Sequence, residues 1–185
     1  MLLSNKRIIY YDLETTGLNN DDNIIEIAGK DNNNNIFNKL INPECEINDK
    51  IVNLTGITNN KIKYRNTIEL NREKIEEWFD FNNKDIYLIA HNGDNFDFKF
   101  LKKSFEINCK QIDTLKFFKK LINQQSYSMK NLCNLFNIKI EGHHRALSDV
   151  IMLEKLFIKG IELYQIKYNL EQVDIDEIYD YTYKS

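Results

Sequence analysis

Proline and cysteine are scarce in this chain of 185 residues. Pro43 is the only proline, and the cysteines are Cys45, Cys109 and Cys133. Because three is an odd number and no two form a C-x-x-C pair, the sequence offers neither a disulfide framework nor a zinc motif. It also lacks the run of about 18 apolar residues that spans a membrane, and an N-terminal secretion signal. We therefore expect a protein that is not secreted and not held in a membrane, located in the cytoplasm or inside a virus or organelle.

Positive charge is not in excess either. Lysine and arginine number 25 against 28 aspartate and glutamate residues, which gives a net charge of −3. Proteins that bind nucleic acid through charge alone are usually basic. Any contact with nucleic acid must therefore use a local site, in which metal ions supply positive charge. Hydrophobic residues make up 42% of the chain, which is enough to build a folded core.

No linker or repeat divides the chain, so we predict one domain over residues 1–170 and an acidic, Tyr-rich tail over residues 171–185. The tail can dock or fray, and a loosely packed terminus is favoured. Apolar and β-branched runs predict strands at 7–12, 24–28, 36–40, 86–90 and 107–112, with a hairpin turn at 32–35. Helical periodicity predicts helices at 67–80, 96–105, 113–121, 128–136 and 145–168. This order indicates an α/β sandwich with a mixed sheet.

Two carboxylates close the first predicted strand. Asp12 and Glu14 are two residues apart, so their side chains lie on the same face of a strand. Their mutual repulsion is relieved if a cation bridges them. The alternative interpretation is a pair of surface carboxylates before the turn at Gly17.

Two further segments hold carboxylates in apolar surroundings. Asp97 stands among phenylalanines at the start of a helix, where it either binds a cation or caps the helix. Asp149 lies between apolar residues at the start of the longest helix, five residues after His144. That histidine is either part of the same site or a structural one.

Taken together, the carboxylates on separate elements favour Mg²⁺ or Mn²⁺ over zinc. Two such ions about 4 Å apart stabilise the attacking and leaving oxygens when a phosphodiester is hydrolysed. A histidine that titrates near neutral pH can accept the proton of the attacking water. The sequence therefore contains the parts of a phosphodiesterase.

These segments also match a known set of motifs in order and in spacing. They read Asp12-Leu13-Glu14-Thr15-Thr16-Gly17-Leu18, Asn92-x3-Phe96-Asp97 and His144-x4-Asp149. Connecting segments match as well, namely Asn42-Pro43, Leu54-Thr55-Gly56-Ile57-Thr58, Ile112-Asp113-Thr114-Leu115 and Ser128-Met129-Lys130-Asn131-Leu132. On these residues the chain resembles the DEDDh 3′→5′ exonucleases, the family of the bacterial DNA polymerase III proofreading subunit, from about residue 7 to residue 160. The resemblance implies a ribonuclease H-like three-layer sandwich with a mixed five-stranded sheet flanked by helices.

The resemblance also implies a role for each motif residue. Two divalent ions, Mg²⁺ or Mn²⁺, would be held by Asp12, Glu14, Asp97 and Asp149, with Asp12 bridging both. His144 would be the general base, since it has the family spacing to Asp149 and its neighbour His143 does not. The 3′-terminal nucleotide would be held by Thr15, Thr16, Gly17, Leu18, Asn92 and Phe96.

The substrate implied is single-stranded nucleic acid with a free 3′ end. DNA is favoured because the residues after Glu14 are closer to those of the DNA-directed members. The alternatives are a 3′→5′ exoribonuclease and a non-catalytic module that binds nucleic acid or a polymerase. A DNA polymerase is a candidate partner, through the acidic residues Asp174, Asp176, Glu177 and Asp180. Two lysine clusters form either solvated helix faces or a phosphate track, and they comprise Lys99, Lys102, Lys103, Lys116, Lys119 and Lys120.

Overall fold

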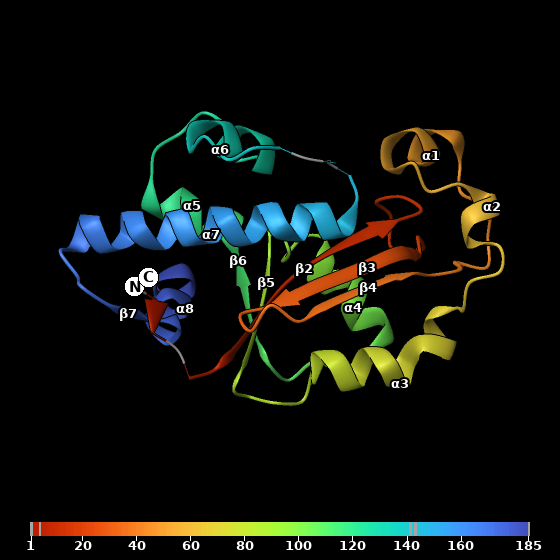
Figure 1. The fold of residues 1–185 in the computed structure, drawn as a ribbon, viewed down its shortest axis with the longest axis horizontal. Coiled ribbons are helices and arrows are strands. Elements are labelled where there is room, and N and C mark those ends of the chain that lie inside the picture. The colour runs from red at the N-terminus through yellow and green to blue at the C-terminus, as the bar shows by residue number, and fades with distance from the viewer. Residues whose placement is uncertain (1, 4, 141, 143, 185) are drawn as a thin grey trace.

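A mixed five-stranded sheet forms the centre of the molecule (Figure 1). The computed structural model describes residues 2, 3, 5–140, 142 and 144–184. The strand order is β4-β3-β2-β5-β6, in which β2, β3 and β4 pair antiparallel and β2, β5 and β6 pair parallel. The strands are β2 (Arg7–Thr15), β3 (Ile24–Asp31), β4 (Ile36–Leu40), β5 (Ile86–Ala90) and β6 (Lys110–Asp113). The α/β fold with a mixed sheet that the sequence predicts is confirmed.

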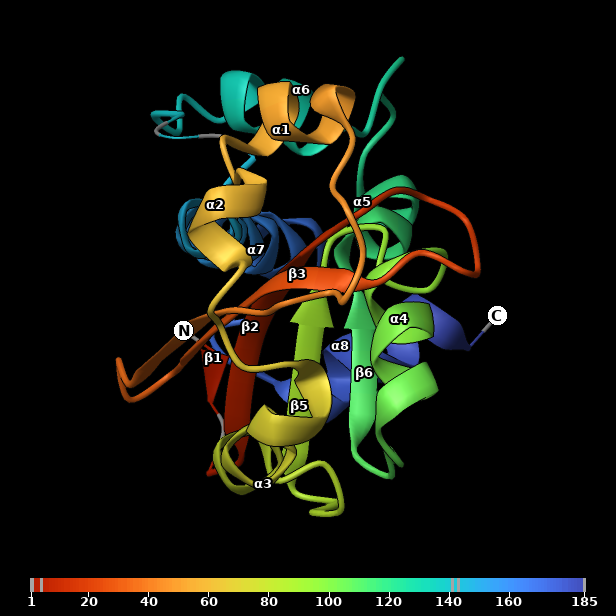
Figure 2. The same ribbon diagram turned by 90° about the vertical axis from the view of Figure 1, so that its right-hand side faces the viewer.

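Helices cover both faces of this sheet, and alternation along β2 shows why. Ile8 and Tyr10 point into the core beneath α7, whereas Ile9 and Tyr11 point into the core on the side of α3 and α4. In both views α7 and α3 lie on opposite sides of the sheet (Figure 1, Figure 2). The helices are α1 (Asp49–Thr55), α2 (Asn59–Ile62), α3 (Ile68–Phe79), α4 (Asp97–Ser104), α5 (Thr114–Leu121), α6 (Met129–Leu135), α7 (Ala146–Tyr168) and α8 (Ile175–Tyr183).

The short helices α1 and α2 were not predicted from the sequence. They span too few residues to show an apolar period, which is the signal that found the longer helices. The signal that the sequence did contain is the N-cap residue of each helix, because asparagine and threonine are common at that position. In the structure the side chains of Asn48 and Thr58 each accept a hydrogen bond from the amide three residues later. These two helices carry the chain from β4 to α3 and place α1 beside the candidate site.

The C-terminal segment is packed against the sheet, and the prediction of a loosely packed terminus is wrong. β7 (Val173–Asp174) pairs in parallel with β1 (Leu2–Leu3), and α8 follows directly. Val173, Ile175 and Ile178 are buried in the core beneath α7. The cause is an apolar stripe within an acidic sequence. Its burial stabilises the packed segment by about 25 cal/mol per Å² of apolar surface removed from water.

The acidic residues of this segment are largely paired within the chain. The Asp176 carboxylate accepts hydrogen bonds from Lys110, Lys6 and Tyr87, and these partners hold the pKa of Asp176 well below its usual range. Asp180 forms an ion pair with Lys184. The Asp180 pair lies within the end of α8, whereas Asp176 attaches α8 to the rest of the fold. A polymerase contact through these residues stays a prediction.

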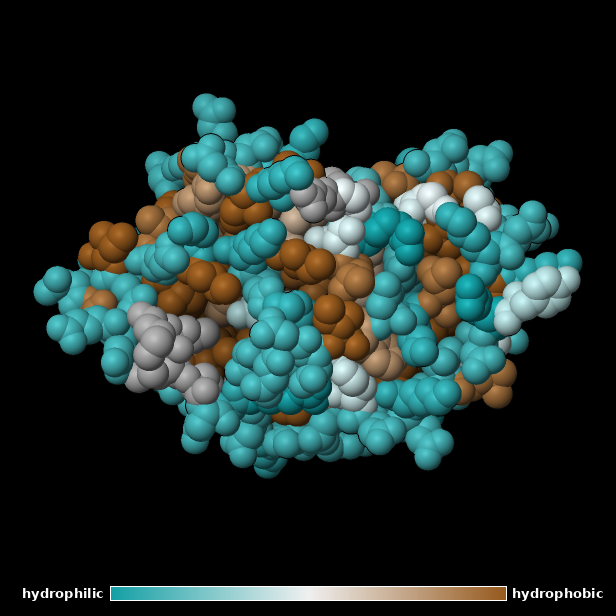
Figure 3. Space-filling model, viewed as in Figure 1, coloured by the Kyte–Doolittle hydropathy of each residue, from teal (hydrophilic) through white to brown (hydrophobic). Residues whose placement is uncertain are grey.

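Hydrophilic residues dominate the face of the molecule that α7 crosses, with hydrophobic residues in separate patches between them (Figure 3). The large exposed hydrophobic residues come from different elements, for example Leu18 after β2 and Ile166 near the end of α7. Within the described part of the chain, no helix is long and apolar enough to cross a bilayer.

Candidate active site

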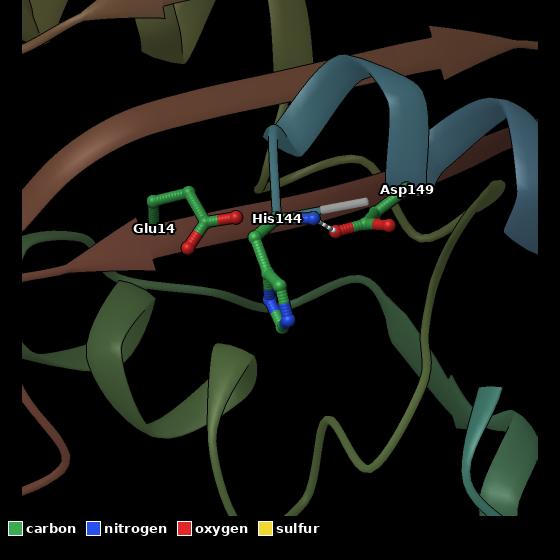
Figure 4. Close-up of side chains that lie close together, drawn as sticks. All are labelled: Glu14, His144 and Asp149. Atoms are coloured by element: carbon green, nitrogen blue, oxygen red, sulfur yellow. Dashed lines mark hydrogen bonds between the residues drawn. The ribbon is translucent and has the colours of Figure 1, made fainter. Parts of the chain in front are cut away.

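Three of the predicted catalytic side chains meet where the C-terminal end of β2 lies beside the start of α7. Glu14 comes from β2, Asp149 from the first turn of α7, and His144 from the segment between α6 and α7 (Figure 4). One ligand atom from each lies within 4.8 Å of the others. Asp12, two residues before Glu14 on the same face of β2, lines the same cavity.

Asp97 lies against the strand that carries Asp12 and Glu14. It is the first residue of α4, it is 2% exposed, and its Oδ1 accepts a hydrogen bond of 3.1 Å from the Leu13 amide. Leu13 stands between Asp12 and Glu14, so this bond fixes the Asp97 carboxylate against the part of β2 that carries both. A role as a helix cap alone does not explain this hydrogen bond, because its donor belongs to β2 and not to α4.

The carboxylates raise one another's pKa values. Burial, followed by the charges of Asp97, Asp149 and Glu14, raises the pKa of Asp12 well above its usual range. Burial is also the largest cause that raises the pKa of Glu14 to about 8 and that of Asp97 to about 8. A divalent cation among these oxygens removes the repulsion and keeps the groups ionised. The donor set, made of hard oxygens with one nearby histidine, fits Mg²⁺ or Mn²⁺.

His144 is held in an unusual backbone conformation. Its φ of 66° lies in the left-handed region, and its backbone amide donates a 3.1 Å hydrogen bond to Oδ2 of Asp149 (Figure 4). This bond turns the chain into α7 and ties the backbone of the predicted base to a predicted metal ligand. His143, the neighbour considered from the sequence, lies outside the described residues.

Glu26 is a site residue that the sequence analysis missed. It is 1% exposed on β3, directly opposite Glu14 in the sheet register. Its carboxylate accepts 3.1 Å and 2.9 Å hydrogen bonds from the guanidinium of Arg145 and a third of 3.1 Å from the Ala146 amide. The available signal was a lone carboxylate within the apolar run of residues 24–28. Its partner could not be found from sequence spacing, because Arg145 lies far along the chain.

A cavity of about 610 Å³ opens beside the carboxylates. Of the residues predicted to hold the terminal nucleotide, Leu18, Asn92 and Phe96 line its wall. Leu18 is 78% exposed, so its side chain is available to pack against a bound group. Additional lining residues were not predicted as site residues, and they include Leu54 of α1, Met129 of α6, His91 and Tyr127.

Thr15, Thr16 and Gly17 are not among the described residues that line this cavity. The hydroxyl of Thr16 donates to Oδ1 of Asp22 at 2.9 Å and accepts from the Asn23 amide. A Cβ at Gly17 would lie 2.6 Å from the Asp22 carboxylate, so glycine permits this close approach. The three residues therefore shape the loop that presents Leu18.

Hydrogen bonds hold in place the part of the cavity wall that contains His91, Asn92 and Tyr127. His91 bonds the Thr114 hydroxyl through Nδ1 and the Tyr127 carbonyl through Nε2, both at 2.8 Å. Burial lowers the pKa of His91 to about 4, so it is a neutral imidazole at physiological pH. The Asn92 amide donates to Oδ1 of Asp113 at 2.9 Å, which fixes Asn92 on the cavity wall.

The lysines of α5 divide between two roles. Lys116 pairs with Asp94 and lies over the ring of Tyr183, and Lys120 donates to the carbonyls of Tyr181 and Lys184, so both contact α8 or the residue that follows it. Lys119 instead lines the cavity beside the carboxylates. In the other cluster, Lys103 donates to the carbonyls of Asn20 and Asp22, whereas Lys99 and Lys102 are exposed. The solvated-face interpretation is thus too simple for α5.

The family model RNase_T, described as an exonuclease, matches residues 9–157. A DNA polymerase III PolC-type of Caldanaerobacter subterraneus subsp. tengcongensis is 34% identical over 168 residues, which cover 85% of this chain and 12% of that protein. The chain therefore spans only a small part of the length of this relative.

Solved structures share the fold. Exonuclease X in complex with 5′ overhanging duplex DNA superposes with a TM-score of 0.71 and 22% identity, covering 95% of this chain and 99% of that one. E. coli exonuclease I in complex with a dA16 oligonucleotide gives a TM-score of 0.67 and 16% identity, covering 95% and 42%. The family resemblance drawn from the sequence motifs is confirmed by the match over residues 9–157, and the chain belongs to the RNase T family of DEDDh exonucleases.

Proposed function

We propose that this protein hydrolyses phosphodiester bonds from the 3′ end of single-stranded DNA and releases nucleoside 5′-monophosphates. The observation that carries the proposal is the meeting of Glu14, His144 and Asp149 within 4.8 Å at the wall of a cavity of about 610 Å³. Asp12 on the same wall and Asp97 behind it bring the number of nearby carboxylates to four.

In this proposal Asp12, Glu14, Asp97 and Asp149 hold two divalent cations, Mg²⁺ or Mn²⁺. When bound, the cations make water more acidic and stabilise the negative charge that develops on the phosphate oxygens. His144 accepts the proton of the attacking water and passes it to solvent. The bond between the His144 amide and Asp149 keeps the imidazole beside the carboxylates while it does so.

The cavity accounts for removal of one terminal nucleotide at a time. Leu18 and Phe96 supply apolar surface for a base, and Asn92 and Lys119 supply polar and cationic groups for sugar and phosphate. The loop of Thr15, Thr16 and Gly17 supports Leu18 through its bonds to Asp22 rather than by direct contact. A pocket with these walls accepts a terminal nucleotide and leaves the rest of the strand outside.

Two relatives support DNA over RNA as the substrate. The PolC-type relative is named as a DNA polymerase, and the E. coli exonuclease I structure contains a dA16 oligonucleotide. An exoribonuclease is the alternative, and matched DNA and RNA oligonucleotides distinguish the two. The PolC relation also supports a DNA polymerase as partner, which co-purification with the polymerase of the same organism would test.

The deciding experiment is a time course on 5′-labelled single-stranded DNA and RNA oligonucleotides with Mg²⁺, Mn²⁺ or EDTA. Wild type is compared with Asp12→Asn and with Asp21→Asn, which replaces an exposed carboxylate outside the site. We expect a ladder that shortens from the 3′ end with metal, is faster on DNA, and is absent in Asp12→Asn alone. A wild-type protein as inert as Asp12→Asn on both substrates would refute the proposal and favour a binding module.

A further inference from the structure

A second cavity, of about 450 Å³, lies at the β4 edge of the sheet. Its walls come from β4, from the segment between α2 and α3, from the first turns of α3, and from Arg145 before α7. Figure 1 shows the α2–α3 segment passing beside the end of β4, and the Asn42 amide bonds the Asn66 carbonyl there at 3.1 Å. We call this cavity the edge cleft.

The edge cleft concentrates positive charge. Its lining includes four cationic side chains, Lys39, Arg65, Lys74 and Arg145, and a single acidic one, Glu26. Glu26 is already matched by the guanidinium of Arg145. Lys39 and Lys74 are exposed, and among the described residues neither has a carboxylate within ion-pair distance. In a chain with net charge −3, such an excess of cations at one place is suited to an anionic ligand.

The wall that carries Tyr64 and Arg65 is held in place by a buried asparagine side chain. Asn71 is 5% exposed, and its amide nitrogen donates to the carbonyls of Asn66 and Thr67 at 3.1 Å and 2.9 Å. The side chain of Tyr64 on this wall is 86% exposed. An aromatic ring beside cations is the combination with which proteins hold a nucleic-acid strand, since bases stack on the ring and phosphates meet the cations.

The edge cleft is linked to the catalytic carboxylates through β3. Glu26 is opposite Glu14 on one side and opposite Leu40, a cleft residue, on the other. Adjacent strands are about 4.8 Å apart, so the cleft wall at Leu40 lies about 10 Å from the strand of the carboxylates. That distance is about three nucleotide rises of one strand of B-form DNA.

We propose that the edge cleft binds the phosphodiester backbone of the nucleic-acid substrate, at a site separate from the cavity for the 3′-terminal nucleotide. The inference rests on the proposed function, because it takes the substrate to be nucleic acid. Lys39 and Lys74 contact phosphates, Arg65 extends this track along the α2–α3 segment, and Tyr64 contacts a base. The strand bound is either the one being cut or its complement, and both present the same phosphate chemistry.

The test measures affinity for a fluorescein-labelled oligonucleotide in EDTA at several salt concentrations. The variants are Lys39→Glu, Lys74→Glu and their combination. The matched control is Lys84→Glu, which changes an exposed lysine just before the start of β5 and outside the edge cleft. We expect the double variant to bind about tenfold more weakly and its salt slope to fall by about 1 to 2. Lys84→Glu should behave as wild type. Equal affinities and slopes for the control and the double variant would overturn the inference.

Two further arms identify the strand and separate this inference from the proposed function. Loss of affinity for single strands assigns the cleft to the cut strand, whereas loss for duplexes with a 3′ overhang alone assigns it to the complement. Cleavage of a dinucleotide, too short to reach the cleft, should keep its wild-type kcat/KM in the double variant. If wild type binds nucleic acid through the edge cleft but cleaves no substrate, the proposed nuclease function is refuted and the inference about the edge cleft stands.

Discussion

Arg145 and Glu26 form a doubly hydrogen-bonded ion pair, with Nε to Oε2 at 3.1 Å and Nη2 to Oε1 at 2.9 Å. Arg145 follows His144 directly, and Glu26 stands opposite Glu14 in the sheet. The pair therefore joins the segment of the proposed base to the strand beside a proposed metal ligand. Arg145 also lowers the pKa of Glu14, against the larger effects that raise it.

Glu26→Gln should lower kcat more than it changes KM. The amide keeps the shape of the side chain, but it can accept fewer hydrogen bonds from Arg145 and the Ala146 amide, so the His144 segment loses its fixed position. We expect kcat to fall about tenfold, which corresponds to about 1.4 kcal/mol, and unfolding free energy to fall by about 1–3 kcal/mol. Steady-state kinetics and urea unfolding measure the two effects.

The control for that variant is Glu69→Gln, which removes half of the exposed ion pair with Arg72 on α3. Exposed pairs contribute little, so kinetics and stability should match wild type. If Glu26→Gln keeps the wild-type kcat while it is destabilised, Glu26 is a structural residue and has no positioning role.

Asp12→Asn should stabilise the metal-free protein and abolish the effect of metal on stability. Without a cation, Asp12 is repelled by Asp97, Asp149 and Glu14, and a neutral amide removes that repulsion. Thermal unfolding in EDTA should therefore give a higher Tm for the variant than for wild type. Addition of Mn²⁺ should raise the Tm of wild type only. An equal Mn²⁺ shift in both proteins would place the ions elsewhere.

The sequence predicted the parts of the site that depend on local periodicity. Strand alternation puts Asp12 and Glu14 on one face, and a helix beginning near Asp149 follows from its apolar period. The pairing of Glu26 with Arg145 depends on the register between β2 and β3 and on where α7 crosses them. Spacing along the chain does not contain that information.

The C-terminal segment shows a second limit of local reading. Composition made residues 171–185 look like an acidic tail, because the stripe of Val173, Ile175 and Ile178 is short and interrupted by carboxylates. Burial of that stripe under α7 is a tertiary effect, and the Asp176 carboxylate finds its cations only in the folded chain. A charged side chain that suggests solvent exposure in a sequence can therefore hold two elements of the fold together.

Acid should weaken the attachment of α8 through Asp176. Its pKa is held below the usual value by hydrogen bonds from Lys110, Lys6 and Tyr87. A carboxyl group with a depressed pKa in the folded state stabilises the fold above its unfolded pKa of about 3.9, and this contribution is lost as the pH falls below that value.

The measurement is urea unfolding of wild type and Asp176→Asn between pH 3 and pH 6. We expect wild type to be the more stable protein above about pH 5 and the difference to shrink below about pH 4. Asp85→Asn, at an exposed residue, serves as the control and should show no such convergence. A difference that stays constant down to pH 3 would mean that Asp176 does not act through its charge.

Tyr183 connects α8 to the wall of the candidate active-site cavity. Its hydroxyl oxygen accepts a 3.0 Å hydrogen bond from the Asp113 amide and donates to Oδ1 of Asp94 at 3.3 Å. The Asp113 carboxylate in turn holds the amides of Asn92 and Asp94 at 2.9 Å and 3.3 Å. Tyr183→Phe leaves the ring and removes the hydroxyl, so it should cost about 1 kcal/mol of stability.

Because Asn92 lines the cavity and the carboxylates of β2 do not depend on this chain of bonds, Tyr183→Phe should raise KM several-fold while kcat and the Mn²⁺-induced Tm shift stay near wild type. Tyr179→Phe on the same helix is the matched control, since among the described residues its hydroxyl forms no hydrogen bond, and its kinetics should not change. Identical KM values for the two variants would show that α8 stabilises the fold without reaching the substrate wall. A raised KM in Tyr183→Phe alone would make the C-terminal helix part of the machinery that holds the 3′ end, even though no residue of α8 lines the cavity.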